Sequence, residues 1–190
     1  MNTLKTLRFG SALLAAVVLV VSCVQDPKSN ATFEVRSERS LKCTDSVVAS
    51  KGSVFVAFGN RRIGNYPSEA DRITINYIEL LLRAKGFSIQ DDKKSADYVF
   101  DLNMSDFFGY ASKRLSRTYY ASLAKQLKTP DEIIENLGYT MVGMWSAKGV
   151  VTFHKKGDLD SLDKAAIRYL IDLYPAQTEA SVKPISVLSH

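Results

Sequence analysis

An uninterrupted apolar run near the start of the chain restricts the cellular compartment in which the rest of the protein can fold. Residues 12–21 are all Ala, Leu or Val; Lys5 and Arg8 precede them, and the small residue Ser22 follows. This order of basic, apolar and small residues is typical of an export signal. A membrane-spanning helix needs about 20 apolar residues, roughly twice the length of this run. We therefore expect residues 1–22 to be removed as a signal peptide.

The end of the run resembles the lipobox of bacterial lipoproteins. Val20, Val21 and Ser22 stand directly before Cys23. The commonest lipobox has Leu in the first place and Ala or Gly in the third, so Val20 and Ser22 are variants. The resemblance implies cleavage before Cys23, a diacylglyceryl thioether on its sulfur and a fatty amide on its amino group. Several acyl chains anchor a protein stably, whereas one anchors it only marginally.

The residue after the cysteine bears on the final compartment. Val24 stands there, where Asp would resemble a signal for retention in the inner membrane of enteric-type bacteria. The resemblance therefore implies a lipid-anchored protein of the cell envelope, in the outer membrane and facing the periplasm.

An ordinary secretory signal is the alternative interpretation of the same residues. Cleavage after Ser22 would then leave Cys23 free to pair with Cys43, the only other cysteine, in an oxidising compartment. Under the lipoprotein interpretation Cys43 stays single. No CxxC motif supports a redox role, so we expect a buried, unreactive thiol.

Composition narrows the classes of function. The 190 residues carry a net charge of +5, and Lys5 and Arg8 belong to the signal, which leaves +3 for the rest. This weak basic excess lacks the dense Lys/Arg stripe of a nucleic-acid-binding protein. A domain of about 150 residues is large enough to be stable without a metal or disulfide. We expect no cofactor.

The mature chain divides into three predicted parts. Residues 23–42 are mostly polar and predict a flexible membrane tether. Residues 43–175 carry the strand and helix patterns of one globular domain. Residues 176–190 look like a loose tail.

Periodicity predicts the elements of the domain. Strands are expected at residues 53–58 and 96–104, and a hairpin at 138–153 that turns at residues 147–149. Helices are expected from Ser68 to Lys85, over residues 112–128, from Thr129 to Gly138, and from about Leu162 to Pro175. This order predicts an α+β fold: a two-layer sandwich with a small, mostly antiparallel sheet, two main helices on one face and a helical insert.

Three short segments resemble a family of small bacterial envelope lipoproteins of unknown function. They are Arg83–Phe87, Ser95–Phe100 and Ile171–Pro175, which correspond to a helix ending in Lys-Gly-aromatic, an Ala-Asp-aromatic strand and a helix ending in aromatic-Pro. Residues 111–137 depart from the family, which has a Gly- and Tyr-rich loop there. The family implies a compartment and a fold but no activity. Lipoproteins that assist lipopolysaccharide export or activate cell-wall synthases share the outline, and they are binding proteins.

Catalytic and metal-binding patterns are weak. His190 is terminal, and His154 stands beside Lys155 and Lys156. Acid–base catalysis requires a partner that orients the histidine, and the sequence shows none beside His154. The chain has no HExxH motif and no Cys/His cluster for zinc. The short acidic pairs at residues 91–92 and 158–160 lack the Gly and terminal Glu of an EF-hand. We assign no catalytic residue and no metal ligand.

One composite feature suggests a partner-binding surface. Aromatic and basic residues interleave after Phe107, and we select five of them as candidates: Arg114, Arg117, Tyr119, Tyr120 and Lys125. Such a mixture suits an anionic glycan or lipid, or an envelope protein. The alternative is that the aromatics are core and the bases a solvated face.

The function that the sequence favours is therefore a membrane-anchored envelope lipoprotein that acts as a non-enzymatic binding or scaffolding module. An envelope hydrolase with dispersed catalytic residues is the alternative.

Overall fold

A computed structural model describes residues 31–41, 43–45, 48, 51–109, 114–154 and 159–185, with the backbone alone at 63, 114, 154, 180 and 183–185. The fold is α+β, as predicted, with helices packed against one face of a mostly antiparallel sheet. Both Cys23 and the signal peptide lie outside the described residues.

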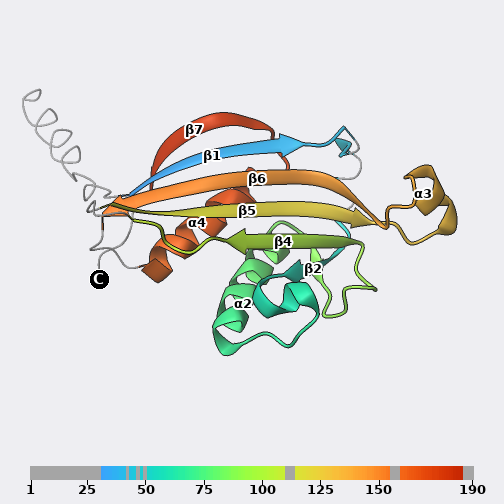
Figure 1. The fold of residues 1–190 in the computed structure, drawn as a ribbon. Helices are drawn as coiled ribbons and strands as arrows, with labels where there is room; N and C mark the ends of the chain where they lie inside the picture. Colours follow the sequence, from blue (N-terminus) through green and yellow to red (C-terminus); the bar gives the residue numbers. More distant parts are fainter. Residues whose placement is uncertain are drawn as a thin grey trace, which may run out of the picture.

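The described strands form one seven-stranded sheet in the order β3-β2-β4-β5-β6-β1-β7 (Figure 1). Only the pairs β2–β3 and β2–β4 are parallel. In chain order the elements are β1 (Ala31–Arg39), β2 (Ser53–Ala57), the 3-10 helix η1 (Gly59–Ile63), α2 (Glu69–Ala84), β3 (Ser88–Ile89), β4 (Tyr98–Met104), β5 (Arg114–Gln126), α3 (Pro130–Glu135), β6 (Met141–His154), α4 (Leu159–Leu173) and β7 (Thr178–Ile185).

Two predicted helix starts are confirmed. Ser68 and Asp71 form a capping box at the start of α2, and Thr129 and Glu132 form another at α3, with Pro130 in the first turn. Each box satisfies backbone N–H groups that the first turn of a helix leaves without partners. The caps depend on local sequence alone, which is why the sequence shows them.

Only some of the apolar residues of α2 are buried. Ile75, Ile78 and Leu82 enter the core, whereas Ile73 and Leu80 are exposed. Helix α2 packs on β2, β3 and α4, and α4 also contacts β1, β5, β6 and β7. The Lys85 ammonium donates to the Asp172 and Tyr174 carbonyls at 3.0 and 3.2 Å, which fixes the end of α2 against the end of α4. The two helices thus form one layer.

The predicted tether is wrong from residue 31 onward, because this segment is strand β1. Ala31, Phe33, Val35 and Ser37 are buried, and the residues between them are exposed. β1 lies inside the sheet, antiparallel to both β6 and β7. Its polar residues occupy every second position, and this alternation with a small apolar set is the signature of a half-buried strand.

The predicted hairpin is also wrong, because β6 runs without a turn through Ala147, Lys148 and Gly149. Gly149 makes room for a neighbour: a Cβ atom built on it would lie 2.3 Å from the Phe33 ring on β1. Glycine inside a strand can mark such a close approach as well as a turn.

Two further segments are strands against expectation. Residues 114–126, predicted as part of a helix, form β5 between β4 and β6. Residues 178–185, predicted as a loose tail, form the edge strand β7 beside β1. Trp145 Nε1 and Ser37 Oγ both donate to the Ala176 carbonyl, at 3.1 and 2.9 Å, and these bonds fix the approach to β7.

The main core lies between the sheet and the two helices. Phe33, Tyr119 and Leu123 from the sheet meet Ile78 of α2 and Leu170 of α4. Cys43 is buried in this core, as predicted. No helix among the described residues combines the length and apolarity that crossing a membrane requires.

Candidate functional site

The five residues that we selected as one surface do not form one. Strand β5 sends alternate side chains to opposite faces of the sheet. Tyr119 points to the helix layer and is fully buried, whereas its neighbour Tyr120 lies on the uncovered face and is 48% exposed. The Arg114 side chain lies outside the described part of the chain. The prediction of a single surface is therefore wrong.

Arg117 and Tyr119 join α4 to the sheet through Asp163. The Tyr119 hydroxyl donates to Asp163 Oδ1, and Arg117 Nη1 donates to Oδ2, both at 2.5 Å. Burial raises the pKa of Asp163, while the Tyr119 hydrogen bond and the Arg117 charge act in the opposite direction. Burial and the Asp163 charge raise the pKa of Tyr119. This is a structural cluster, because it is enclosed by the sheet and α4.

The aromatic residues before β5 also divide. The Arg117 guanidinium lies 3.6 Å from the centre of the Phe107 ring, and Phe107 packs edge-on against Phe153. Phe108 is exposed. For Tyr119 and Phe107 the structure therefore agrees with the core alternative, whereas Arg117 belongs neither to an open partner surface nor to a solvated face.

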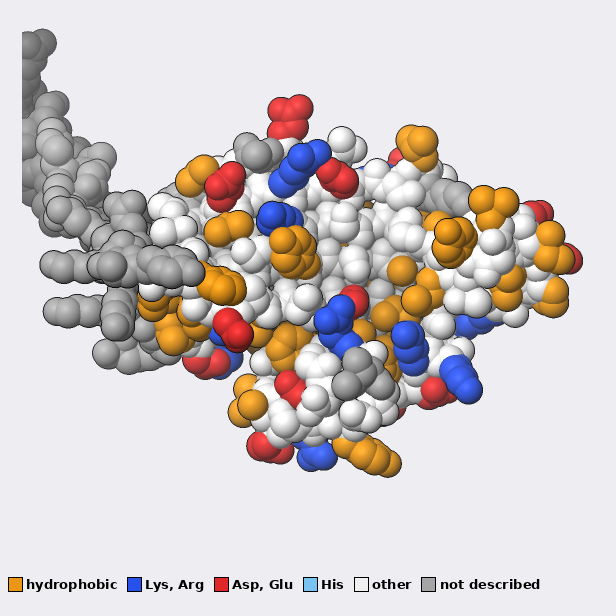
Figure 2. All heavy atoms as spheres, in the orientation of Figure 1, with side chains coloured by type: hydrophobic (Ala, Val, Ile, Leu, Met, Phe, Trp, Pro, Cys, Tyr) orange, Lys and Arg blue, Asp and Glu red, His pale blue; other side chains and the backbone are white. Residues whose placement is uncertain are grey.

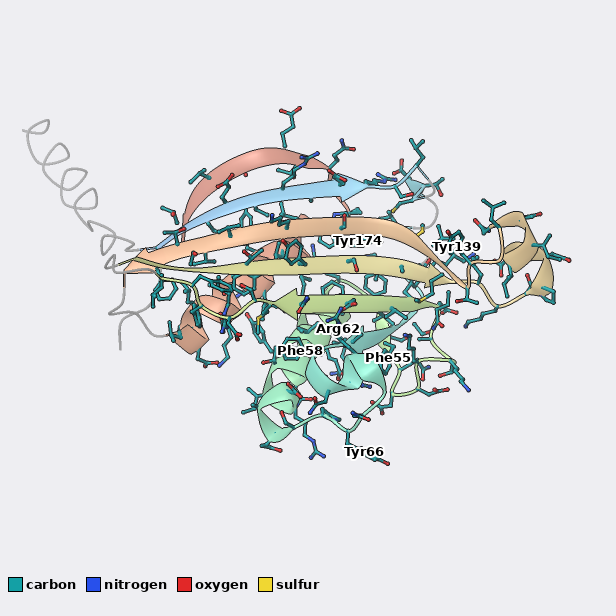
Figure 3. All side chains as sticks on the ribbon, in the orientation of Figure 1. Phe55, Phe58, Arg62, Tyr66, Tyr139 and Tyr174 are labelled. Atoms are coloured by element: carbon teal, nitrogen blue, oxygen red, sulfur yellow. The ribbon has the colours of Figure 1, made fainter. Side chains whose placement is uncertain are left out.

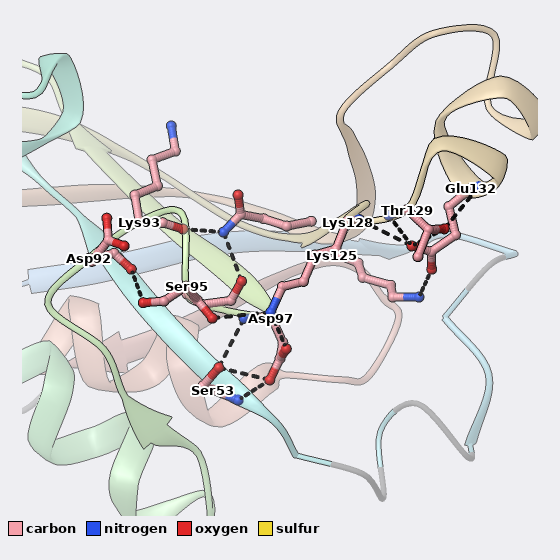
Figure 4. A network of polar contacts seen from close by, with 11 residues as sticks. Ser53, Asp92, Lys93, Ser95, Asp97, Lys125, Lys128, Thr129 and Glu132 are labelled. Atoms are coloured by element: carbon pink, nitrogen blue, oxygen red, sulfur yellow. Dashed lines mark hydrogen bonds and ion pairs between the residues drawn. The ribbon is translucent and has the colours of Figure 1, made fainter.

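Lys125 belongs to a polar network at the far end of β5 (Figure 4). Its ammonium lies 3.0 Å from Glu132 Oε1, and Lys128 lies 2.7 Å from Asp97 Oδ1. These lysine hydrogen bonds, with backbone donors, lower the pKa of Asp97 and of Glu132 to about 2. Asp97 also accepts from the Ser53 backbone and hydroxyl at 2.9 and 2.8 Å. The ammonium of Lys125 therefore stabilises the position of α3 at this end of the sheet.

Tyr120 stands at the centre of a shallow hollow on the uncovered face. Two rows of side chains cross the strands from β4 to β1. The first row is Asn103, Tyr120, Lys148 and Arg36, and the second is Asp101, Ser122, Ser146 and Glu38. These residues and Arg62 line a hollow of about 480 Å³. Helix α4 passes behind the sheet in Figure 1, so Figures 1 and 2 look onto this face.

Most charges in the hollow are paired. Arg62 Nε lies 2.7 Å from Asp101 Oδ1, and Arg36 Nη2 lies 2.6 Å from Glu38 Oε1. Lys148 lies 5.4 Å from the centre of the Tyr120 ring, and it has no acidic partner within ion-pair distance among the described residues. The hollow therefore combines an aromatic ring, hydroxyl and amide groups, and one spare positive charge. Figure 2 shows bases and acids scattered singly over this face.

Arg61, next to Arg62, is used differently. It stacks 4.4 Å from the centre of the Phe55 ring and pairs with Glu79 at 3.1 Å and with Asp91 at 3.2 Å. It thereby shields the small cluster of Phe55, Ala57, Ala96 and Val99. Val99, which the alternation in β4 places on the solvent-facing side, is buried as a member of this cluster. In Figure 3 the labelled Phe55 and Arg62 lie in this part of the molecule.

Among the described residues, the remaining candidates give no site. The His154 side chain and residues 155–158 lie outside the described part. Within the described residues, no group of three or more His, Cys, Asp or Glu side chains could hold a metal ion. The rows around Tyr120 were missed because only pairing across strands brings Arg36, Asp101 and Lys148 together.

Comparison with known proteins shows only distant structural similarity. No protein-family model and no curated protein matches the chain. The PelC dodecamer from Paraburkholderia phytofirmans is 18% identical, with a TM-score of 0.47, and the match covers 77% of this chain and 99% of that chain. A DUF4136 family protein from Bacteroides thetaiotaomicron is 7% identical, with a TM-score of 0.41, over 73% of this chain and 91% of that chain.

A PDZ domain protein from Parabacteroides distasonis is 11% identical, with a TM-score of 0.47, and the match covers 81% of this chain and 38% of that chain. The structural neighbours thus include a DUF4136 family protein. At these sequence identities and TM-scores, no function can be transferred from the neighbours to this chain.

Proposed function

We propose that the chain is a lipid-anchored binding module of the bacterial cell envelope, held in the outer membrane through Cys23, and that it binds its ligand in the hollow around Tyr120. The observation that carries the proposal is the uncovered sheet face, where two polar rows surround an exposed ring. The chemistry of the hollow favours a saccharide with acidic groups. A tyrosine ring offers flat contact area, Ser122, Ser146 and Asn103 offer hydrogen bonds, and Lys148 offers the charge. The envelope hydrolase stays an alternative that no described residue specifically favours.

The ligand is tested with an array of acidic and neutral oligosaccharides, probed with the purified full-length lipoprotein in detergent. We expect binding to acidic members, and Tyr120→Ala should weaken it about tenfold, as removal of one good stacking contact of about 1.4 kcal/mol would. Tyr66→Ala is the matched control, because Tyr66 is 91% exposed and lies outside the hollow (Figure 3). Equal effects of the two changes, or no binding by the unchanged protein, would contradict the proposal.

The anchor is tested separately. Cys23→Ala should abolish acylation and leave an unprocessed precursor, because the sulfur that receives the diacylglyceryl group is gone. Mass spectrometry of the mature amino terminus of the unchanged protein is the deciding measurement. An unacylated terminus beginning at Cys23 would refute the anchor and favour a disulfide between Cys23 and Cys43.

A further inference from the structure

Helix α3 and the segment that follows it expose apolar side chains at one end of the molecule. Ile134 is 72% exposed, Leu137 88% and Tyr139 68%, and Met141 is also exposed. None of the residues of α3 is buried. Figure 2 shows hydrophobic side chains gathered over this end, and Figure 3 places Tyr139 there. A hollow of about 330 Å³ opens beside Leu137, Tyr139 and Val142. We call the set Ile134, Leu137, Tyr139 and Met141 the α3 tip.

The α3 tip keeps its shape without burying these side chains. The capping box of Thr129 and Glu132 starts the helix, and Lys125 pairs with Glu132. At the other end, the Gly138 N–H donates to the Ile133 carbonyl at 2.8 Å, and Asn136 Nδ2 donates to the Glu132 carbonyl at 2.7 Å. Polar contacts therefore hold the α3 tip in place while its apolar side chains stay exposed, as is typical of a surface that a binding partner covers.

Leu137 adopts an unfavourable backbone conformation. Its φ is +58°, in the left-handed region, where a side chain is strained and glycine is preferred. Gly138 follows with φ +81°. A strained leucine whose side chain is almost fully exposed gains nothing for the fold, so the strain points to a role outside it.

The α3 tip lies far from the anchored end of the sheet. Ala31, the first described residue after the proposed anchor, pairs with Phe153, whereas the α3 tip includes Met141 at the opposite end of β6. Met141 and Phe153 are twelve positions apart along β6, which is about 40 Å at about 3.3 Å per residue. On the proposed anchoring, the α3 tip therefore points away from the membrane that holds the protein.

The charges of α3 restrict its occupant further. Asp131 and Glu135 are exposed beside the apolar residues, and neither has an ion-pair partner among the described residues. A second copy docked symmetrically would bring like charges together, and an anionic lipid surface would repel them. A partner that presents basic residues beside apolar ones would match both the exposed acidic side chains of α3 and the apolar side chains of the α3 tip.

We propose that the α3 tip is a docking surface for a protein partner that presents apolar residues beside Lys or Arg. The test places the photo-crosslinker p-benzoylphenylalanine at Tyr139 of the full-length chain, in the bacterial cells that naturally produce it. Crosslinked peptides are then identified by mass spectrometry. The expected product joins residue 139 to a segment of another protein that contains apolar and basic residues. The same crosslinker at Tyr66, which is more exposed than Tyr139 but lies outside the α3 tip, should not give this product.

Two variants separate docking from folding. Leu137→Gly removes the exposed side chain and suits the positive φ, so it should keep or raise the melting temperature while lowering the crosslink yield at least fivefold. Asp131→Lys with Glu135→Lys should lower the yield similarly. The proposal is overturned if residue 139 crosslinks to lipid, to a second copy or to a segment without bases, or if it gives no crosslink. It is also overturned if residue 66 gives the same product or if Leu137→Gly keeps the full yield. Because the crosslink reports on the α3 tip alone, its failure is distinct from failure of the anchor or of the Tyr120 hollow.

Discussion

Replacing Phe33 by alanine is expected to lower the free energy of unfolding by about 3–5 kcal/mol, the usual cost of removing a buried aromatic side chain. Phe33 is fully buried, packs edge-on against Tyr119 and Tyr169 at ring distances of 6.3 and 5.4 Å, and covers Gly149. The loss leaves a cavity between β1, β5, β6 and α4. A urea titration followed by circular dichroism measures the effect.

The control for this prediction lies one residue further on. Glu34 is exposed on the same strand, so Glu34→Ala should change stability by no more than about 0.5 kcal/mol. If residues 23–42 were a tether throughout, both changes would leave stability unaltered. A Phe33→Ala protein as stable as the Glu34→Ala protein would therefore disprove the place of β1 in the core.

Replacing Asp163 by alanine is expected to cost about 3 kcal/mol, the lower end of the range for breaking a buried ion pair, because both partners keep some solvent contact. The change leaves the Arg117 charge and the Tyr119 hydroxyl without their common acceptor, between the sheet and α4. The same urea titration measures it.

Asp160 is the matched control on the same helix. Its side chain is exposed and pairs with Lys164 at 2.6 Å, so Asp160→Ala should cost less than about 1 kcal/mol. Equal costs for the two aspartates would show that the Asp163 cluster contributes no more than a surface ion pair.

The strand β5 was mistaken for a helix because its spacing fits both structures. Leu115, Tyr119, Leu123 and Leu127 are four residues apart. Four residues are close to one turn of a helix, and they are also an even number, which keeps side chains on one face of a strand. The pairing of β5 with β4 and β6 decides between the two, and that pairing is absent from the local sequence.

The fold class was predictable because the strongest local signals were right. The capping boxes and the Lys85-Gly86-Phe87 end of α2 each depend on a few adjacent residues. The alternation in β4 does so too, although Val99 departs from it and is buried. The strand β1 does carry such an alternation, but only Phe33 and Val35 are large apolar residues, and the charged residues around them favoured the tether interpretation. The strand β7 lacks a clear local signal and includes Pro184, and its pairing with β1 makes it a strand.

The candidate site was predictable only at Tyr120. The sequence suggested an aromatic–basic surface, and a linear pattern cannot show which of two adjacent tyrosines faces the helices. Tyr119 and Tyr120 differ by one residue, and that step moves a side chain from core to surface. The partners of Tyr120 come from β1, β4 and β6, which are far apart in the sequence.

The position of β1 has a mechanical consequence. With an anchor at Cys23, residues 24–31 can span at most about 28 Å, so one end of the sheet stays near the bilayer. Tension on the anchor would enter at Ala31 and run along β1, which is hydrogen-bonded to β6 on one side and to β7 on the other. Both ladders would then be loaded in shear, so their hydrogen bonds would share the force. An edge strand pulled sideways would instead open one bond at a time.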